Sequence, residues 1–222
     1  MSACFITATG TDIGKTYVAS GLIRHWRAAG RPVEALKPVA TGFDPASAEA
    51  SDAGVLLAAL GRPVTPAEID RISPWRYAAP LSPDMAAQRE SRSIDFDALA
   101  TFSQAAIAGN KGMLLIEGIG GIMVPLDNRH TVLDWMVVLN IPLLLVTGSY
   151  LGSLSDTLTA LDVLTRRGLT VKAVVVNETP GSQVAIESTI ETIKRFARAI
   201  PIVEMRRMAA PTFRPLAERL ES

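Results

Sequence analysis

The stretch GTDIGKT, residues 10–16, follows the short apolar run CFITA (4–8) and precedes a segment whose apolar residues recur at helical spacing. The residues on that apolar face are Val18, Leu22, Ile23 and Trp26. A strand, a glycine turn and a helix in this order form a phosphate-binding loop, because backbone N–H groups and the positive end of the helix dipole point at the anion. The stretch therefore predicts a nucleotide site in a domain of the P-loop NTPase type.

Two polar side chains of this stretch suit a nucleoside triphosphate. Lys15 would neutralise β- and γ-phosphate oxygens, and the Thr16 hydroxyl would bind Mg²⁺. The strict pattern G-x-x-x-x-G-K-[ST] has a glycine five residues before Gly14, whereas Thr9 stands there with Gly10 beside it, so the loop is a variant. A chance GKT at the start of a helix is the alternative, and the strand and helix on either side argue against it.

Composition limits the class of protein. The chain has 222 residues, 48% of them hydrophobic, so we expect a single domain over 1–222 with one core. Lysine plus arginine and aspartate plus glutamate number 22 each, without long runs of like charge, so we expect no nucleic-acid partner. A single cysteine and the lack of a signal-peptide pattern lead us to expect a cytoplasmic protein.

Residues 135–155 carry no charge and would be long enough to cross a bilayer. Asn140, Pro142, Gly148 and Gly152 interrupt this run, which predicts a helix end, a strand and a loop instead. We therefore expect no membrane partner.

Apolar runs alternate with helical patterns along the chain, as in a parallel sheet covered on both faces. The predicted strands are 5–8, 33–39, 113–116, 143–147, 171–176 and 200–203. The predicted helices are 15–29, 51–60, 94–108, 132–139, 153–167, 183–199 and 211–220. The proline-rich stretch 62–83 is expected to be a long irregular excursion. The sequence thus predicts an α/β fold with a mostly parallel central sheet, whose ligands gather at the carboxyl ends of the strands.

Two predicted strands deliver charged side chains to that edge. Lys37 lies in the apolar run ALKPVATG (35–42), where an ammonium needs a partner, so it is the leading catalytic candidate; a lysine reaching to water from a strand edge is the alternative. Glu117 ends a strand before a glycine-rich turn, and with Thr16 it suits Mg²⁺, which prefers carboxylate and hydroxyl oxygens. Asp52 is a further ligand or the N-cap of the next helix, and the residues alone favour the cap.

Taken in order, GTDIGKT, KPVATG, SD before a helix, and IEGIGG followed by PL and DW resemble the dethiobiotin synthetase family over about residues 5–177. Each motif is only moderately specific, whereas their joint order is strongly so. The resemblance implies an ATP-dependent ligase of biotin synthesis. Such an enzyme converts 7,8-diaminononanoate and CO₂ to a carbamate, uses the γ-phosphate of ATP to make a mixed carbamic-phosphoric anhydride, and closes the ureido ring.

The resemblance also implies roles for individual residues. Lys37 would hold the carbamate and the transferred phosphoryl group while Lys15 bridges phosphates, which makes both catalytic. The implied Mg²⁺ ligands are Thr16, Asp52 and Glu117. The implied substrate contacts are Thr11, Lys37, Thr41, Leu151 and Gly152, the last two across a homodimer interface. The implied ATP contacts are Asp12, Ile13, Gly14, Lys15, Thr16, Tyr17, Asp52, Glu117, Gly118, Ile119, Gly120, Asn177 and Glu178.

The base of the nucleotide is the least determined part of the site. Asn177 stands where the family has an adenine-reading asparagine, whose amide can donate to N7 and accept from the exocyclic amine; a turn residue that ends a strand is the alternative. The chain departs from the family at Ala8 and Gly10 in the loop, at Thr41 in place of serine, and at residues 204–208, EMRRM, in place of an Ile-Pro segment against adenine. The contacts of the base pocket therefore stay open.

Two other functions remain as alternatives. A partition or septum-positioning ATPase shares the fold, but such ATPases carry a lysine four residues before the second loop glycine, where this chain has Gly10. A related corrin amidoligase needs a glutamine-derived ammonia source, and Cys4 within the first strand is a poor nucleophile for that task.

Overall fold

The computed structural model describes residues 2–206 and 212–221. At its centre is a six-stranded sheet in the order β2-β5-β1-β6-β7-β8, in which every neighbouring pair is parallel. Its strands are β1 (Ser2–Ala8), β2 (Val33–Leu36), β5 (Met113–Glu117), β6 (Leu143–Gly148), β7 (Val171–Asn177) and β8 (Ile202–Met205). The predicted α/β class and parallel sheet are confirmed.

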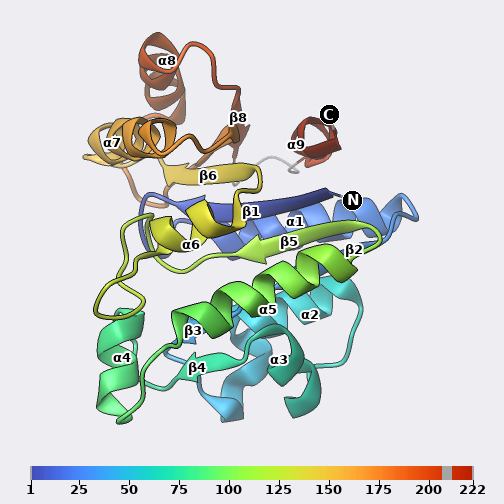
Figure 1. Cartoon of the computed structure of the whole chain (residues 1–222). Coiled ribbons are helices and arrows are strands. Elements are labelled where there is room, and N and C mark those ends of the chain that lie inside the picture. The colour runs from blue at the N-terminus through green and yellow to red at the C-terminus, as the bar shows by residue number, and fades with distance from the viewer. Residues whose placement is uncertain (1, 207–211, 222) are drawn as a thin grey trace.

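Helices cover both faces of this sheet (Figure 1). On one side α1 (Lys15–Ala28) contacts both α2 (Asp52–Leu60) and α9 (Arg214–Glu221). On the other side α5 (Phe96–Gly109) contacts α6 (Val132–Leu139), and α7 (Ser153–Arg166) contacts α8 (Ile186–Phe196). The chain passes from β1 to β2 in one direction across the sheet and from β2 through β5, β6 and β7 to β8 in the other. Because crossovers between parallel strands are right-handed, the two directions place their helices on opposite faces.

The core is centred on β1, which lies between β5 and β6. Phe5 and Ile6 are fully buried there, and the ring of Trp135 from α6 meets that of Phe5 edge to face at 4.8 Å between centroids. Since β1 is interior, the loop that follows it emerges in the middle of the carboxyl edge of the sheet. That position brings the ends of β5, β6 and β7 within reach of residues 9–14.

The predicted strand 33–39 is wrong in its second half, because the chain leaves the main sheet after Leu36. Pro38 has no N–H with which to continue the ladder. Val39–Thr41 instead form β3, which pairs in parallel with β4 (Trp75–Tyr77) in a separate two-stranded sheet. The Lys37 N–H donates to the Ile72 carbonyl at 3.0 Å, so Lys37 stands at the break between the two sheets.

The prediction of an irregular excursion over 62–83 is also wrong. This stretch contains α3 (Pro66–Ile72) and β4, and η1 (Pro45–Ala50) and α4 (Pro83–Arg89), which were not predicted, lie to either side. The Thr65 side chain caps α3 by accepting from the Glu68 N–H, and Pro66 occupies the start of that helix, where its missing N–H costs nothing. Proline begins these helices instead of breaking them, and they are too short to show a clear period.

The other elements lie where the sequence places them, with shifts of a few residues at their ends. β8 runs two residues beyond its predicted end, and α9 begins at Arg214; the predicted start, Pro211, lies outside the described residues. The uncharged run 135–155 divides into the end of α6, strand β6 and a loop before α7, as predicted. Within 2–206 and 212–221, no helix combines the length and the apolar character that a membrane crossing requires.

Candidate active site

The loop between β1 and α1 is built around Gly14, whose φ of +97° lies in the left-handed region. A Cβ on Gly14 would stand 2.3 Å from the Nδ2 atom of Asn177, so both the backbone and the available space require glycine. Asn177 ends β7, and its Nδ2 donates to the Ile13 carbonyl at 2.7 Å. The end of β7 therefore holds the loop in place.

Lys15 bends back over this loop and is 7% exposed. Its Nζ donates to the carbonyls of Gly10 at 3.2 Å and of Gly120 at 3.1 Å. Burial lowers the pKa of Lys15 to about 8, and repulsion from the Lys37 ammonium contributes next. Because both hydrogen-bond acceptors are neutral carbonyls, a phosphate oxygen would supply the negative charge that they lack.

Lys37 lies between the buried Glu117 and the partly exposed Asp52, and it is itself only 2% exposed. Its Nζ donates to Glu117 Oε1 at 2.8 Å and to the Gly118 carbonyl at 2.7 Å, and it lies 3.0 Å from Asp52 Oδ2. The alternative of a lysine reaching to water is therefore wrong. Burial alone would lower the pKa of Lys37, but the carboxylates of Glu117 and Asp52 reverse this and raise it, so the side chain stays charged.

Thr16 completes this cluster, because its hydroxyl lies 2.8 Å from Asp52 Oδ1 and 2.7 Å from Glu117 Oε1. One hydroxyl proton can serve only one of these oxygens at a time. The second carboxylate oxygen of Glu117 is buried without a hydrogen-bond partner. The oxygens of Thr16, Asp52 and Glu117 thus lie close together, and one Glu117 oxygen has no partner. Such oxygens are suitable ligands for a hard cation such as Mg²⁺.

Asp52 is not the N-cap of α2, which the residues alone favour. Ser51 caps the helix by accepting from the Gly54 N–H at 3.1 Å, which frees the Asp52 carboxylate to face Thr16 and Lys37. Burial would raise the pKa of Asp52, but the Lys37 ammonium and the Thr16 hydrogen bond together lower it. Over the described residues no group of three histidine, cysteine, aspartate or glutamate side chains could hold a metal; beside Asp52 and Glu117, the further side-chain oxygen of this cluster is the Thr16 hydroxyl.

Two cavities meet at the loop. The first, about 320 Å³, is lined by the predicted site residues Thr11, Asp12, Gly14, Lys15, Thr16, Lys37, Thr41, Asp52, Ile119 and Gly120, together with Ala40. Glu117 and Gly118 reach it through their contacts with Lys37. Its lining thus combines two lysines, the Asp12 and Asp52 carboxylates and three threonines, in a cavity that is open on one side.

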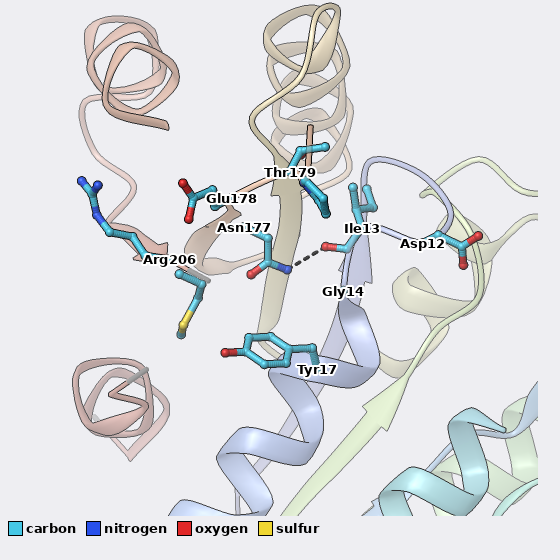
Figure 2. A pocket seen from close by; sticks show the side chains of 10 residues that line it. Asp12, Ile13, Gly14, Tyr17, Asn177, Glu178, Thr179 and Arg206 are labelled. Atoms are coloured by element: carbon cyan, nitrogen blue, oxygen red, sulfur yellow. Dashed lines mark hydrogen bonds between the residues drawn. The ribbon is translucent and has the colours of Figure 1, made fainter. Parts of the chain in front are cut away.

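The second cavity, about 350 Å³, opens on the other side of the loop (Figure 2). Its predicted residues are Asp12, Ile13, Gly14, Tyr17, Asn177 and Glu178, and Thr179, Pro180, Met205 and Arg206 were not predicted. Since Asp12 and Gly14 line both cavities, a ligand that crosses the loop would occupy both. The buried Asn177 Oδ1 has no hydrogen-bond partner and can accept one from such a ligand.

Part of the predicted site lies elsewhere. Leu151 is 93% exposed and Gly152 caps the N-terminus of α7, and neither residue lines the two cavities. The departure at 204–208 does place Met205 and Arg206 in the second cavity, while Arg207 and Met208 lie outside the described residues. Met205 could have been predicted from its position at the end of a strand. β7 and β8 are parallel neighbours, so their carboxyl ends lie at the same edge of the sheet.

Comparison with known sequences gives one consistent result. A family model described as an AAA domain matches residues 2–207. The chain is 52% identical to the ATP-dependent dethiobiotin synthetase BioD of Acidiphilium cryptum (strain JF-5), over 90% of this chain and 91% of that protein. It is 48% identical to the protein of the same name from Methylobacterium nodulans (strain LMG 21967 / CNCM I-2342 / ORS 2060), over 89% and 90% of the two chains.

Comparison with solved structures gives more distant matches. The chain resembles the MinC:MinD cell division protein complex of Aquifex aeolicus with a TM-score of 0.55 and 13% identity, over 99% of this chain and 86% of that one. It resembles a ParA family ATPase from Chlorobium tepidum TLS with a TM-score of 0.53 and 14% identity, over 99% and 89%. Likeness at this identity concerns the fold alone, and it agrees with the predicted P-loop NTPase type.

Proposed function

The chain belongs to the family of ATP-dependent dethiobiotin synthetases, which are ATP-dependent ligases of biotin synthesis, and from this we propose that ATP spans its two cavities. The triphosphate would lie in the first cavity against Lys15, and the base in the second beside Asn177. The observation that carries this assignment is the cluster in which the buried Lys37 and Glu117 meet the more exposed Asp52 and Thr16, next to the phosphate-binding loop. Membership of this family argues against the alternatives of a partition ATPase and a corrin amidoligase.

In the proposed reaction, negative charge develops close to the ammonium groups of Lys15 and Lys37. One amine of 7,8-diaminononanoate attacks the carbon of CO₂, and the resulting carbamate oxygen attacks the γ-phosphorus while the bond to ADP breaks. The second amine then attacks the carbamoyl carbon and releases phosphate. We propose that Lys37 holds the carbamate and the transferred phosphoryl oxygens and that Lys15 bridges the phosphates, because fixed cations stabilise developing anionic charge.

The substrate pocket would be completed by hydroxyl and backbone groups. Thr11 and Thr41 line the first cavity, where they can donate to an amine-derived carbamate or accept from an amine. Ile119 and Gly120 line the same wall, next to Gly118, whose carbonyl already accepts from Lys37. These residues would orient the carbamate so that its oxygen faces the γ-phosphate.

The function is tested by incubating the protein with ATP, Mg²⁺, bicarbonate and 7,8-diaminononanoate. We expect dethiobiotin and ADP to form in equal amounts. A folded protein that binds ATP and yet makes no dethiobiotin under these conditions would contradict the proposal.

We further propose that Thr16, Asp52 and Glu117 hold Mg²⁺, which would neutralise charge on the β- and γ-phosphate oxygens. The unpartnered Oε2 of buried Glu117 supports this fit. Lys37 already occupies two of the same carboxylates, so a divalent cation must compete with its ammonium.

This competition predicts that Lys37→Met binds divalent cations more tightly than the unaltered protein when no nucleotide is present. We expect Mn²⁺ to bind at least about tenfold more tightly, a change of about 1.4 kcal/mol, because removal of the ammonium leaves two carboxylates facing each other. Electron paramagnetic resonance of free Mn²⁺ measures this affinity, and the shift in melting temperature with Mn²⁺ gives a second measure. Glu117→Gln is the matched control and should weaken the binding; equal affinities for all three proteins would argue against the shared position.

A second prediction concerns pH and rests on Lys15. Its pKa of about 8 in the free protein leaves it partly neutral at pH 8.5, and bound phosphates would favour the charged form. ATP binding at pH 8.5 is therefore expected to take up protons, and affinity should fall as pH rises through 8. Titration calorimetry in two buffers of different protonation enthalpy measures the uptake, with pH 6.5 as control because Lys15 is already charged there. Buffer-independent heats at pH 8.5 would exclude this role of Lys15.

A homodimer and a cytoplasmic location are also proposals. The exposed Leu151 and the adjacent Gly152 lie at the start of α7, outside the cavities, which suits a contribution to the site of a second copy. Sedimentation of the protein with and without Leu151→Asp tests the dimer. The location rests on the use of ATP and on the single, buried Cys4.

A further inference from the structure

Tyr17 is a half-exposed aromatic residue in the wall of the second cavity. Its side chain is on the first turn of α1, directly after the loop, and 41% of it is exposed. Figure 2 shows the ring on the opposite side of the cavity from Asn177 and Arg206. A large ring that borders a cavity loses contact with water only when a ligand covers it, and such covering is favourable.

The Tyr17 ring also contacts Phe213, the residue directly before α9. The Phe213 ring lies 5.9 Å from that of Tyr17 at an angle of 59° and is 9% exposed. A Cβ on Gly21 would stand 2.0 Å from Phe213 Cζ, so the missing side chain of Gly21 makes room for that ring on α1. Phe213 is thus inserted into the helix surface next to Tyr17.

The helix that follows Phe213 is itself anchored to α1. Glu221 accepts a hydrogen bond from Trp26 Nε1 at 2.7 Å and forms an ion pair with Arg31. Leu216, Ala217 and Leu220 of α9 are buried. Phe213 is therefore held against the middle of α1, and the helix after it is held against the C-terminal part of α1 and Arg31.

We propose that Tyr17 is the surface on which the nucleotide base stacks and that Phe213 is a positioning residue that holds it. This rests on the proposed placement of ATP across the two cavities. Stacking uses the π-face that every base has, so it provides affinity without choosing a base. Choice would fall to the unpartnered Asn177 Oδ1, which favours a base that presents an N–H donor, such as the adenine amino group, toward it. Affinity and selectivity for the base would thus come from different residues.

The test compares ATP with inorganic tripolyphosphate, which can occupy the phosphate loop but has no base. We expect Tyr17→Ala to weaken ATP binding at least about tenfold, about 1.4 kcal/mol, and to leave tripolyphosphate binding unchanged. Tyr17→Phe should stay within about twofold of the unaltered protein for both ligands, because the ring remains. Calorimetry measures both affinities, and steady-state kinetics should place the loss in KM for ATP and not in KM for the diamine.

Phe213 is tested by the same pair of ligands. Phe213→Ala is expected to weaken ATP binding without affecting tripolyphosphate, and adding it to Tyr17→Ala should cause no further loss, because it acts through that ring. Phe213→Leu serves if the alanine variant does not fold. Phe196→Ala removes an aromatic ring that is 70% exposed on α8, far along the chain, and should change neither affinity.

The outcomes separate the two proposals. Unchanged ATP binding in Tyr17→Ala, or equal losses for ATP and tripolyphosphate, would overturn the stacking role, the second because it indicates a displaced loop. An unaltered protein that binds ATP in this manner but forms no dethiobiotin would overturn the proposed function and leave the stacking role standing. An unaltered protein that binds no ATP would overturn both.

Discussion

Lys37→Met is expected to lower kcat for dethiobiotin formation by about 10²- to 10³-fold, because the variant lacks the cation that we propose binds the carbamate and the transferred phosphoryl group. Binding of ATP should change much less, since Lys15 and the loop remain. Removal of one partner from a buried ion pair also costs about 3–5 kcal/mol of folding stability, because Glu117 keeps its charge inside the protein. The rate must therefore be measured well below the melting temperature of the variant.

A double variant separates the two effects of this change. Lys37→Met with Glu117→Gln removes both charges of the pair and should recover much of the lost stability, while activity stays low. Thermal melting and product formation, measured on the same samples, report these quantities independently. Activity that returned together with stability would show that Lys37 serves the fold and not the reaction.

Gly14→Ala is expected to abolish measurable ATP binding. The substitution places a Cβ 2.3 Å from Asn177 Nδ2 and asks alanine to adopt φ +97°, a conformation that L-residues rarely take. Either the loop or the end of β7 must move. Such a movement would disrupt the hydrogen bond that Asn177 donates to the Ile13 carbonyl, which joins the two. Calorimetry with ATP measures the loss.

Gly30→Ala is the matched control for backbone strain. Gly30 also has a positive φ, +69°, but nothing stands within 4 Å of a Cβ at that position, beyond the end of α1. It should lose about 1–2 kcal/mol of stability through strain and bind ATP normally. If the two alanine variants lost affinity to the same degree, the contact between Gly14 and Asn177 would not explain the effect.

Much of the fold could be predicted because its signals are local. Long Val/Ile/Leu runs bounded by helices identify parallel strands, and the loop 10–16 identifies the edge at which ligands gather. Glu117 and Asn177 could be placed there because each ends a strand of that sheet. The small sheet of β3 and β4 could not be predicted, because three-residue strands and short proline-started helices carry little periodic pattern.

The parts of the site that depend on contacts between distant elements were less visible. Asp52 faces Thr16 only because α2 packs against α1, while its local sequence resembles a helix cap. The resemblance placed residues 204–208 at the base pocket without assigning contacts, and Met205 and Arg206 reach the second cavity because β8 continues past its predicted end. The pairing of Phe213 with Gly21 joins the two ends of the chain, and nothing near either residue in sequence indicates it.

The second sheet separates two tasks that the enzyme must perform. Ala40 and Thr41, on β3, form one wall of the first cavity, and this strand belongs to a segment between β2 and α5 that shares no ladder with the six-stranded sheet. In the proposed arrangement the nucleotide lies against the loop of the large sheet, and the β3 wall faces the amine. Substitutions of Ala40 or Thr41 on β3 are therefore expected to alter which diamine is accepted, whereas Lys37 and Asp52 of the same segment are the residues proposed to serve the phosphates and Mg²⁺.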